Sequence, residues 1–339
     1  MRRPDSFDTF LGDTKMPTKA WKRAPLLAAI VAAGIASQAQ ALPQVYALSY
    51  LNLYNGAIVG GPNVTFGAPV TNVGASSTVN LVPGPIGNCS GVIDCTTPAI
   101  PGYAQSGSTP GAITNNAFVA FGQAASNGTN YGWGDSHISS LNPFHLVNEG
   151  ESSSTPANSA TGKGNGDVFI PFTVTASSAL DLSFDAIPFL QAFLDPAATG
   201  IATAALSMSV TIVNQSTGVT VFSFAPDGTI GGTVGGTVLL DPFSLNVTLV
   251  SSLPFGAGNG IYNPCSILVP TGEAPGVCSV SNHFDVISNL LAPGTFALHL
   301  TDPESTSTHN SSIPEPASIA LLGLGLAALG LTRRRKLAW

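Results

Sequence analysis

The clearest hydrophobic pattern in the chain is an alternation of apolar and polar side chains near position 210. The alternating apolar residues are Leu206, Met208, Val210 and Ile212, and the residues between them are serine or threonine. A period of two places every second side chain on one face of a β-strand, so one face of this segment is predicted to be buried. A turn-rich segment follows at 214–218, and apolar residues return at 219–224. The pattern predicts an antiparallel hairpin.

Shorter apolar segments recur along the chain and are separated by turns rich in Gly, Pro, Asn and Ser. The other segments predicted to form strands are 45–51, 77–82, 114–121, 168–175, 179–184, 237–240, 244–250, 284–288 and 295–301. Pro171 indicates an edge position for its strand, because proline lacks the amide hydrogen that a central strand donates. The segment 187–194 fits neither period cleanly, so a short helix and a strand both stay open. Many short strands with frequent turns predict a mainly β fold, an antiparallel β-sandwich or jelly roll.

Two polar stretches are predicted to lie outside the packed strands. Residues 149–166 have the composition of a flexible loop, and a boundary between two subdomains could lie there. Residues 302–313 are rich in Ser and Thr and are predicted to form a tether. With these boundaries, residues 42–301 form a β-rich domain.

The first 41 residues are predicted to be a leader and signal peptide and not a part of the fold. The charged residues that open the signal are Lys19, Lys22 and Arg23. They precede an apolar segment at 24–36, predicted to be the signal helix, and a small-x-small site formed by Ala39 and Ala41. We expect signal peptidase to cut after Ala41. Met16 is an alternative start, and the residues before it are either an extended leader or untranslated.

A second apolar segment, 317–331, lies near the C-terminus, and Ser318 is its only polar side chain. As a helix its fifteen residues would span about 22 Å, less than the roughly 30 Å hydrocarbon core of a bilayer. The segment is therefore predicted to be a short transmembrane helix that is held only until processing. The tripeptide before it is Pro314-Glu315-Pro316, and the basic residues after it are Arg333, Arg334, Arg335 and Lys336. These cations should stay on the cytoplasmic side of the membrane.

The arrangement at 314–339 resembles the PEP-CTERM sorting domain of Gram-negative bacteria. The resemblance implies that a membrane protease, the exosortase, recognises and cleaves the signal. It also implies transient contact with the inner membrane, a final location at the cell surface or outside the cell, and a link to biofilm or extracellular matrix. The resemblance covers less than a tenth of the chain and implies no activity.

The eleven Lys and Arg side chains are distributed very unevenly. Within residues 42–313 only Lys163 is basic, against fourteen Asp and Glu, which gives this part a formal net charge of −13. Nucleic-acid affinity depends on Lys and Arg side chains that neutralise phosphates. Nucleic-acid binding is therefore excluded as the function of this part.

The four cysteines fall into two local pairs, Cys89 with Cys95 and Cys265 with Cys278. An even cysteine count in an exported protein predicts disulfides. Local pairing is favoured because turn residues within each pair let its ends meet, although two other connectivities stay open. Neither a Cys-x-x-Cys spacing nor clustered histidine supports a zinc site, so no metal site is predicted. A Ca²⁺ site assembled from distant loops stays open, and the sequence does not place it.

Two short motifs carry acids or a nucleophile, and each of them also fits an ordinary structural role. The fragment Gly134-Asp135-Ser136-His137 is similar to the start of one group of esterases, but the later Asp-x-x-His pair is missing. A plain turn is favoured there. Glu149 and Glu151 would share one face of a strand, as a pair of carboxyl groups for glycoside hydrolysis requires. Their serine-rich surroundings favour a solvated loop instead.

Aromatic side chains near the middle of the chain are candidate carbohydrate contacts. Tyr131 and Trp133 have flat rings with polar edges, which suit sugar stacking, and the alternative is that they fill a core. The sequence as a whole favours a non-enzymatic surface or matrix protein without cofactors that associates with exopolysaccharide. A carbohydrate-binding or adhesion module on the same scaffold is the alternative, and a secreted hydrolase is a weaker one.

Overall fold

The computed structural model describes residues 44–80, 82–83, 87–90, 103–107, 130–141, 143–196, 198–252, 260–267 and 276–311. All of them belong to one unit of the chain, Leu42–Trp339. The described residues form antiparallel strands in two sheets, which confirms the predicted mainly β sandwich. Among them no helix is long and apolar enough to cross a bilayer. The signal helix, the C-terminal apolar segment and the strand predicted at 114–121 lie outside the described residues.

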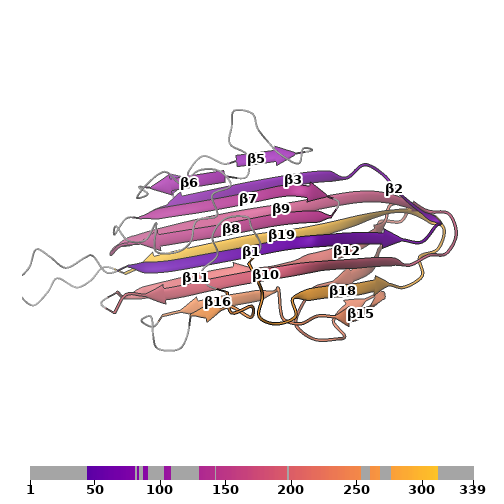
Figure 1. Cartoon of the computed structure of the whole chain (residues 1–339). Coiled ribbons are helices and arrows are strands. Elements are labelled where there is room, and N and C mark those ends of the chain that lie inside the picture. Colours follow the sequence, from indigo (N-terminus) through magenta and orange to yellow (C-terminus); the bar gives the residue numbers. More distant parts are fainter. Residues whose placement is uncertain are drawn as a thin grey trace, which may run out of the picture. The chain divides into compact units, whose positions relative to one another are not determined.

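Sheet A has the strand order β15-β18-β10-β1-β8-β7-β6, and β17 also pairs with β10. Its strands are β1 (Val45–Gly60), β6 (Tyr103–Gly107), β7 (Tyr131–Leu141), β8 (Phe144–Ser154), β10 (Leu180–Leu194), β15 (Gly236–Leu240), β17 (Ile261–Tyr262) and β18 (His283–Ser288). Strand β1 pairs with β8 on one side and with β10 on the other, and Figure 1 shows it along β10.

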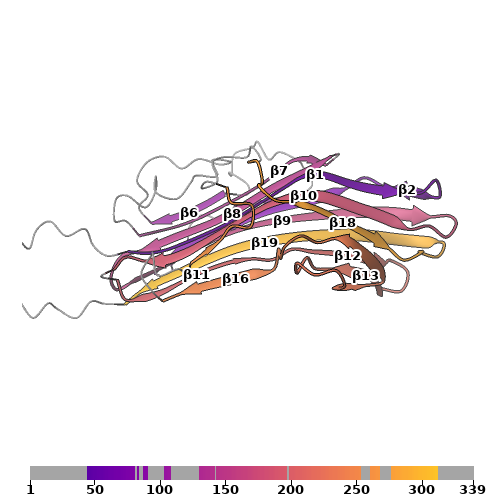
Figure 2. The ribbon, with the colours of Figure 1, turned by 60° about the horizontal axis from the view of Figure 1, so that its bottom comes forward.

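Sheet B has the order β14-β13-β12-β19-β9-β3-β4, with β11 joining β19 to β16, β2 on β9, and β5 on β3. Its strands are β2 (Val64–Phe66), β3 (Val70–Val79), β4 (Val82–Pro83), β5 (Gly87–Ser90), β9 (Asn158–Val174), β11 (Gly200–Leu206), β12 (Ser209–Asn214), β13 (Thr220–Phe224), β14 (Thr233–Val234), β16 (Val247–Ser251) and β19 (Gly294–Asn310). In Figure 2 the two layers separate, with β1, β8 and β10 in one and β19, β12 and β16 in the other.

The predicted hairpin near position 210 is confirmed. Strand β12 pairs with β13, and the turn between them is closed by Gly218, which donates its N–H to the carbonyl of Asn214. Gly218 has a φ of +70°, a conformation that glycine adopts without strain. The ambiguous segment 187–194 is a strand, because it continues β10 along the whole of β1.

Strands β9 and β19 are longer than the sequence predicts and correct two predictions. They pair over their full length, from Val174 opposite Gly294 to Asn158 opposite Asn310. The predicted flexible loop at 149–166 is instead the end of β8 and the first half of β9, apart from a short turn. The predicted tether is also wrong up to Asn310, because those residues form the second half of β19. Both stretches are rich in small polar residues, which pack between closely spaced sheets as well as they form loops.

Pro171 lies in the interior strand β9 and not at an edge, so the edge prediction is wrong. Gly67 donates its N–H to the Pro171 carbonyl, which shows that the backbone polar groups of Pro171 face the side of β2 and β3. Strand β2 pairs with β9 as far as Phe172, and the pairing of β3 with β9 begins at Phe169, opposite Val70. The missing amide hydrogen of the proline therefore faces the break between these two strands.

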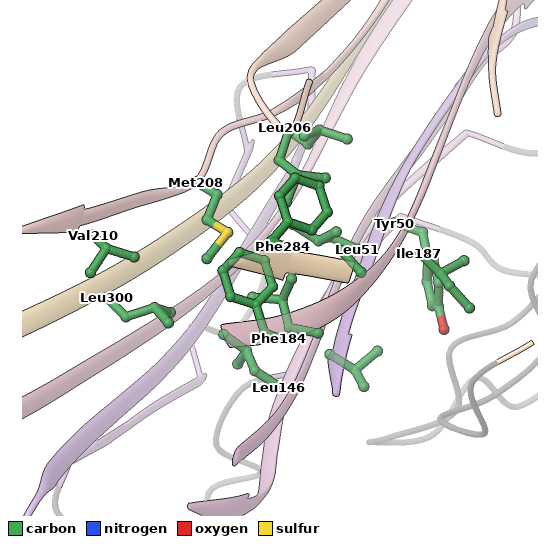
Figure 3. Close-up of a cluster of buried hydrophobic side chains, with 14 of the residues drawn as sticks. Tyr50, Leu51, Leu146, Phe184, Ile187, Leu206, Met208, Val210, Phe284 and Leu300 are labelled. Carbon is green, nitrogen blue, oxygen red and sulfur yellow. The ribbon is translucent and has the colours of Figure 1, made fainter. Parts of the chain in front are cut away.

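The apolar core lies between the sheets at the end where β10, β12, β18 and β19 meet. Leu206, Met208, Val210 and Ile212 are at most 2% exposed, as their alternation predicts. Phe184 of β10 stacks on Phe284 of β18 with ring centroids 4.9 Å apart. Figure 3 shows these rings facing Met208, while Tyr50 and Ile187 lie on the other side of sheet A.

At the other end the two sheets approach each other through glycine. A Cβ atom at Gly132, Gly134 or Gly150 of sheet A would lie less than 3 Å from a backbone carbonyl oxygen of β9. Gly162 and Gly164 of β9 meet the backbone of β7 and β8 in the same way. Side chains larger than hydrogen do not fit at these positions. The five glycines therefore set the spacing of the sheets along β7, β8 and β9.

Candidate functional site

Five carboxyl groups are buried along β7, β8 and β19, in two groups on opposite sides of sheet A. Glycines 134 and 150 point toward sheet B, so the residues that alternate with them point to the opposite side of sheet A. Asp135, Glu149 and Glu151 lie on this outer side and are at most 1% exposed. Asp302 and Glu304 of β19 lie between the sheets and are equally buried.

Glu151 is held by two tyrosines from the neighbouring strands. The hydroxyl of Tyr46 on β1 donates to Oε1 of Glu151 over 2.8 Å, and the hydroxyl of Tyr131 on β7 donates to the same oxygen. Burial raises the pKa of Glu151 to about 7, and the two hydrogen bonds oppose this rise. The protonation state of this carboxyl therefore changes near neutral pH.

The neighbouring carboxyl group of Glu149 also favours its neutral form. Burial raises the pKa of Glu149 well above its ordinary value, and the nearby Glu151 and Asp135 raise it further. Repulsion between carboxylates in a site that excludes water is the physical cause. Glu149 and Glu151 thus differ in their pKa, as two carboxyl groups with different surroundings do.

The two carboxyl groups between the sheets bind residues of sheet A. Asn148 donates its Nδ2 hydrogen to Oδ2 of Asp302 over 2.9 Å, and the Ser49 hydroxyl donates to Oε2 of Glu304. Burial raises the pKa of both Asp302 and Glu304 well above the ordinary values. No lysine or arginine accompanies these carboxyls in the described part of the chain, since Lys163 lies on the other face of sheet B. Burial therefore favours the neutral form of the two acids that join the sheets.

This geometry corrects the surroundings predicted for the Glu149 and Glu151 pair and for the two aromatic rings. The glutamates lie in the middle of a strand and not in a solvated loop. Tyr131 and Trp133 are fully buried, so neither ring presents a face to a sugar at the surface. Trp133 is a buried side chain of β7, as the alternative for this residue predicts. The fragment 134–137 is likewise part of β7 and not a turn, because its residues pair with β8 from Gly134 opposite Gly150 to His137 opposite Val147.

The sequence analysis missed Tyr46, Asp302 and Glu304 as members of these clusters. In the fold the buried residues of β19 alternate with exposed or half-buried ones from Asp302 to Asn310. The alternation is between polar side chains, so a search for apolar periodicity does not find it. No signal identifies Tyr46, since its contact with Glu151 spans 105 positions.

The outer face of sheet B carries a second site, a shallow open groove of about 420 Å³. Its side chains come from neighbouring positions of β3, β9 and β19: Gly74, Ser76, Lys163, Asn165, Pro303 and Ser305. The register places Ser76 beside Lys163 and Lys163 beside Ser305. Hydroxyl, amide and ammonium groups therefore share one exposed surface.

The disulfide between Cys265 and Cys278 is present, which confirms one predicted pair. It closes a segment next to β10, where the Ser279 hydroxyl also donates to the Cys265 carbonyl over 2.9 Å. Cys95 lies outside the described residues, so the pairing of Cys89 with Cys95 stays a prediction. Among the described residues no group of three or more His, Cys, Asp or Glu side chains is arranged to hold a metal ion.

The residues of the predicted processing signals lie outside the described part of the chain. These are Ala39 and Ala41 at the signal cleavage site, the motif Pro314, Glu315 and Pro316, and the basic residues Arg333, Arg334, Arg335 and Lys336. Their assignment rests on the sequence and on the family comparison below.

Comparison with solved structures and curated proteins leaves the domain without a family. The structures of infectious bursal disease virus strains Gt and Gx share 11% and 9% identity with the chain. The alignments cover 86% of this chain and 74% and 75% of theirs, with a TM-score of 0.09 in both cases. Such low scores say nothing about the fold. No curated protein matches the chain.

The C-terminal segment does match a family model. Residues 312–336 match the model described as the PEP-CTERM protein-sorting motif, while the rest of the chain is matched to no family. The matched range contains the Pro-Glu-Pro tripeptide, the apolar segment and the basic end that the sequence analysis singled out. The chain therefore carries a PEP-CTERM sorting signal at its C-terminal end, consistent with an exosortase substrate that is exported across the inner membrane to the cell surface or extracellular space.

Proposed function

We propose that the released domain is a non-enzymatic component of the cell surface or extracellular matrix that associates with exopolysaccharide in biofilms. The observation that carries this proposal is the sorting motif at 312–336, which directs the domain to the cell surface or extracellular space, where an exopolysaccharide would be within its reach. Signal peptidase and exosortase are the processing partners in this proposal. No cofactor is required for this role.

The buried acids favour a structural role over hydrolysis. A glycoside hydrolase needs two carboxyl groups that reach the scissile bond of a bound sugar. Glu149 and Glu151 are 1% and 0% exposed, and Glu151 is already occupied by two tyrosine hydroxyls. A substrate would have to displace these contacts, so we propose that the pair supports the sheet and performs no chemistry.

A carbohydrate-binding or adhesion module is the second candidate function, and the groove on sheet B is the observation that favours it. Its hydroxyl and amide groups are suited to hydrogen bonds with sugar hydroxyls. This function is compatible with the first, since a matrix component that binds the polymer directly would be held there more firmly.

The mass of the mature protein tests the sorting step. Protein recovered from the cell surface should end between Ser312 and Pro316, and a variant with Pro314, Glu315 and Pro316 replaced by alanine should keep the tail and stay in the membrane fraction. The substitution Ser311→Ala, just before the motif, serves as the matched control. A surface protein that retains Arg333–Lys336 would contradict the proposal.

Incubation with the native polysaccharide tests the matrix role. The processed protein should sediment with the polymer and release no reducing sugar from it. Release of sugar would identify a hydrolase. A protein that stays in the supernatant would contradict the matrix role.

A further inference from the structure

Lys163 occupies an exceptional position in the charge distribution of the domain. It is the only Lys or Arg among residues 42–313, where fourteen acids are present. It lies in the middle of the 17-residue strand β9 and is exposed. In the described part of the chain its ammonium group makes no ion pair. The fold therefore presents its one cation to solvent and does not use it to neutralise a buried acid.

The surroundings of Lys163 are polar and almost uncharged. Gly162 and Gly164 point toward sheet A, so Lys163 and Asn165 point away from it, into the groove. Ser76 and Ser305 flank Lys163 on the two neighbouring strands. One row further along, Gly74, Asn165 and Pro303 form the rest of the groove. The small side chains of both neighbouring strands leave room beside the longer lysine and asparagine.

The strands β3, β9 and β19 that form the groove carry three acids, and of these only Asp167 shares its outer face, while Asp302 and Glu304 point between the sheets. Glu304 borders the groove only on its interior side, because its side chain is 1% exposed and binds Ser49 of sheet A. Asp167 is on the same face of β9 as Lys163, four residues further on, about 13 Å along the strand. Exposed charges at this distance are largely screened at physiological salt, where the Debye length is about 8 Å. An anion can therefore approach Lys163 in spite of the net charge of the domain.

We propose that this groove binds an acidic polysaccharide, with the Lys163 ammonium paired to a carboxylate of the polymer and Ser76, Asn165 and Ser305 bonded to its hydroxyl groups. The proposal rests on the proposed matrix function and assigns it a surface and a ligand class. A sugar ring carries hydroxyl groups on several sides, and the groove carries hydroxyl and amide groups on several sides that can bond to them. A uronate adds one negative charge per ring. Nucleic acid does not fit, because its affinity requires several cations that act together.

A single groove of this kind binds weakly, and repetition along the polymer compensates for the weakness. One exposed ion pair and a few hydrogen bonds give low affinity for a short oligosaccharide. A polysaccharide presents the same unit many times, so many copies of the domain can bind one polymer molecule. Together these copies hold the polymer at the surface more tightly than one groove does. The groove is open at the surface, which lets a long polymer pass through it.

Titration of the processed protein with a uronate hexasaccharide tests the proposal. The acid should bind at least fivefold more tightly than its methyl ester at physiological salt, and further added salt should weaken only the acid. Lys163→Gln should lower the affinity for the acid to that of the ester, and Lys163→Arg should preserve binding. Thr173→Gln, on the same face of β9 but ten residues away, is the matched control and should bind like the wild type.

A second variant and a second ligand keep the result unambiguous. Ser76→Asp places a carboxylate opposite Lys163 and should weaken binding as strongly as Lys163→Gln, with an unchanged unfolding midpoint because both positions face solvent. Inorganic phosphate should bind much more weakly than the hexasaccharide. Equal affinity for acid and ester, an undiminished affinity in Lys163→Gln, or phosphate binding as tight as the sugar would overturn the proposal.

The native polysaccharide separates this inference from the function on which it rests. If the wild-type protein does not sediment with the polymer, the matrix function is wrong. If the wild type and Lys163→Gln sediment equally, the matrix function stands and the groove is not its binding surface.

Discussion

The hydroxyl of Tyr46 donates a hydrogen bond of 2.8 Å to Oε1 of Glu151, a carboxyl that is fully buried and shares this oxygen with Tyr131. The three residues come from β1, β8 and β7 and so link adjacent strands of sheet A through side chains. Two donors on one oxygen are what an ionised carboxylate needs when water is excluded. The two tyrosine hydroxyls therefore contribute most to the stability of the sheet when Glu151 is ionised.

Replacing Tyr46 by phenylalanine should destabilise the domain more at pH 8 than at pH 5. The ring contact with Phe193, at 5.3 Å between centroids, is retained, so only the hydroxyl is lost. A hydrogen bond to a charged group contributes about 1.5–3 kcal/mol, and one to a neutral group about 0.5–1.5 kcal/mol. Urea unfolding of wild type and variant at the two pH values measures the difference.

Tyr262→Phe is the matched control for this experiment. The Tyr262 hydroxyl donates to the Ser244 carbonyl over 2.6 Å, and that acceptor does not ionise in this range. Its loss should cost the same free energy at pH 5 and pH 8. If Tyr46→Phe behaves like this control, Glu151 does not change its charge between the two values.

The stability of the domain should fall as the pH rises through the acidic range. Glu151 has an ordinary pKa of 4.5 and a folded value of about 7. Below about 4.5 the carboxyl is protonated in both states, and its stabilising effect is complete. Between the two values the unfolded chain loses this proton while the folded chain keeps it, so the contribution of Glu151 to the free energy of unfolding falls by about 1.4 kcal/mol per pH unit, about 3 kcal/mol in total. Chemical unfolding of wild type and Glu151→Gln at intervals from pH 4 to pH 8 measures this contribution apart from that of the other buried acids.

Neutral substitutions between the sheets should reduce this pH dependence further into the alkaline range. Burial raises the pKa of Glu304 well above its ordinary value, so this residue also lowers the stability of the fold as the pH rises. Glu304→Gln keeps an acceptor for Ser49 and cannot ionise, so it should be more stable than the wild type at pH 9 and about equal at pH 4. An unchanged pH profile in this variant would show that Glu304 is not titrating in the fold.

The sequence predicted the parts of the fold whose faces differ in polarity, and it failed where they do not. The alternation at Leu206–Ile212 is apolar against hydroxyl, so the buried face was evident. In β19 both faces are polar beyond Thr301, and the same composition is typical of a linker. Only the pairing with β9 and β11 decides between the two, and that pairing joins residues about 100 to 150 positions apart.

Prediction of the candidate sites was limited in the same way, because their surroundings depend on strand pairing between distant residues. Glu149 and Glu151 were recognised as the close pair of acids, since alternation alone places them on one face. Their burial depends on strands β1 and β7, and the tyrosine contacts depend on register. Lys163 was visible as the single cation of the domain, but its groove exists only because β3 and β19 bring small residues to both of its sides. The sorting motif was found in full because it is a contiguous signal.

Gly134→Ala should destabilise the domain strongly because the added methyl group has no space. Its Cβ atom would lie less than 3 Å from the Lys163 carbonyl oxygen, which is part of the β9 backbone and cannot move independently of the sheet. Overpacking of this kind costs about 1–3 kcal/mol, and the lower flexibility of the unfolded chain offsets less than about 1 kcal/mol of that. Gly294→Ala, where the nearest atom is 3.4 Å away on the Phe296 ring, should change the unfolding midpoint much less. Equal midpoints for the two variants would contradict the close approach of the sheets.

Loss of the Cys265–Cys278 disulfide should lower the free energy of unfolding by about 3 kcal/mol, since the bond closes a loop with a sequence separation of 13. The effect should appear mainly in the unfolded chain, which gains freedom when the loop opens. Cys265→Ala combined with Cys278→Ala isolates it from the pair Cys89 and Cys95, which a reducing agent would also affect. Adding reductant to this double variant then reports the contribution of the second pair alone. A double variant as stable as the wild type would mean that the contacts around Cys265, including the Ser279 hydrogen bond to its carbonyl, already hold the segment without the covalent link.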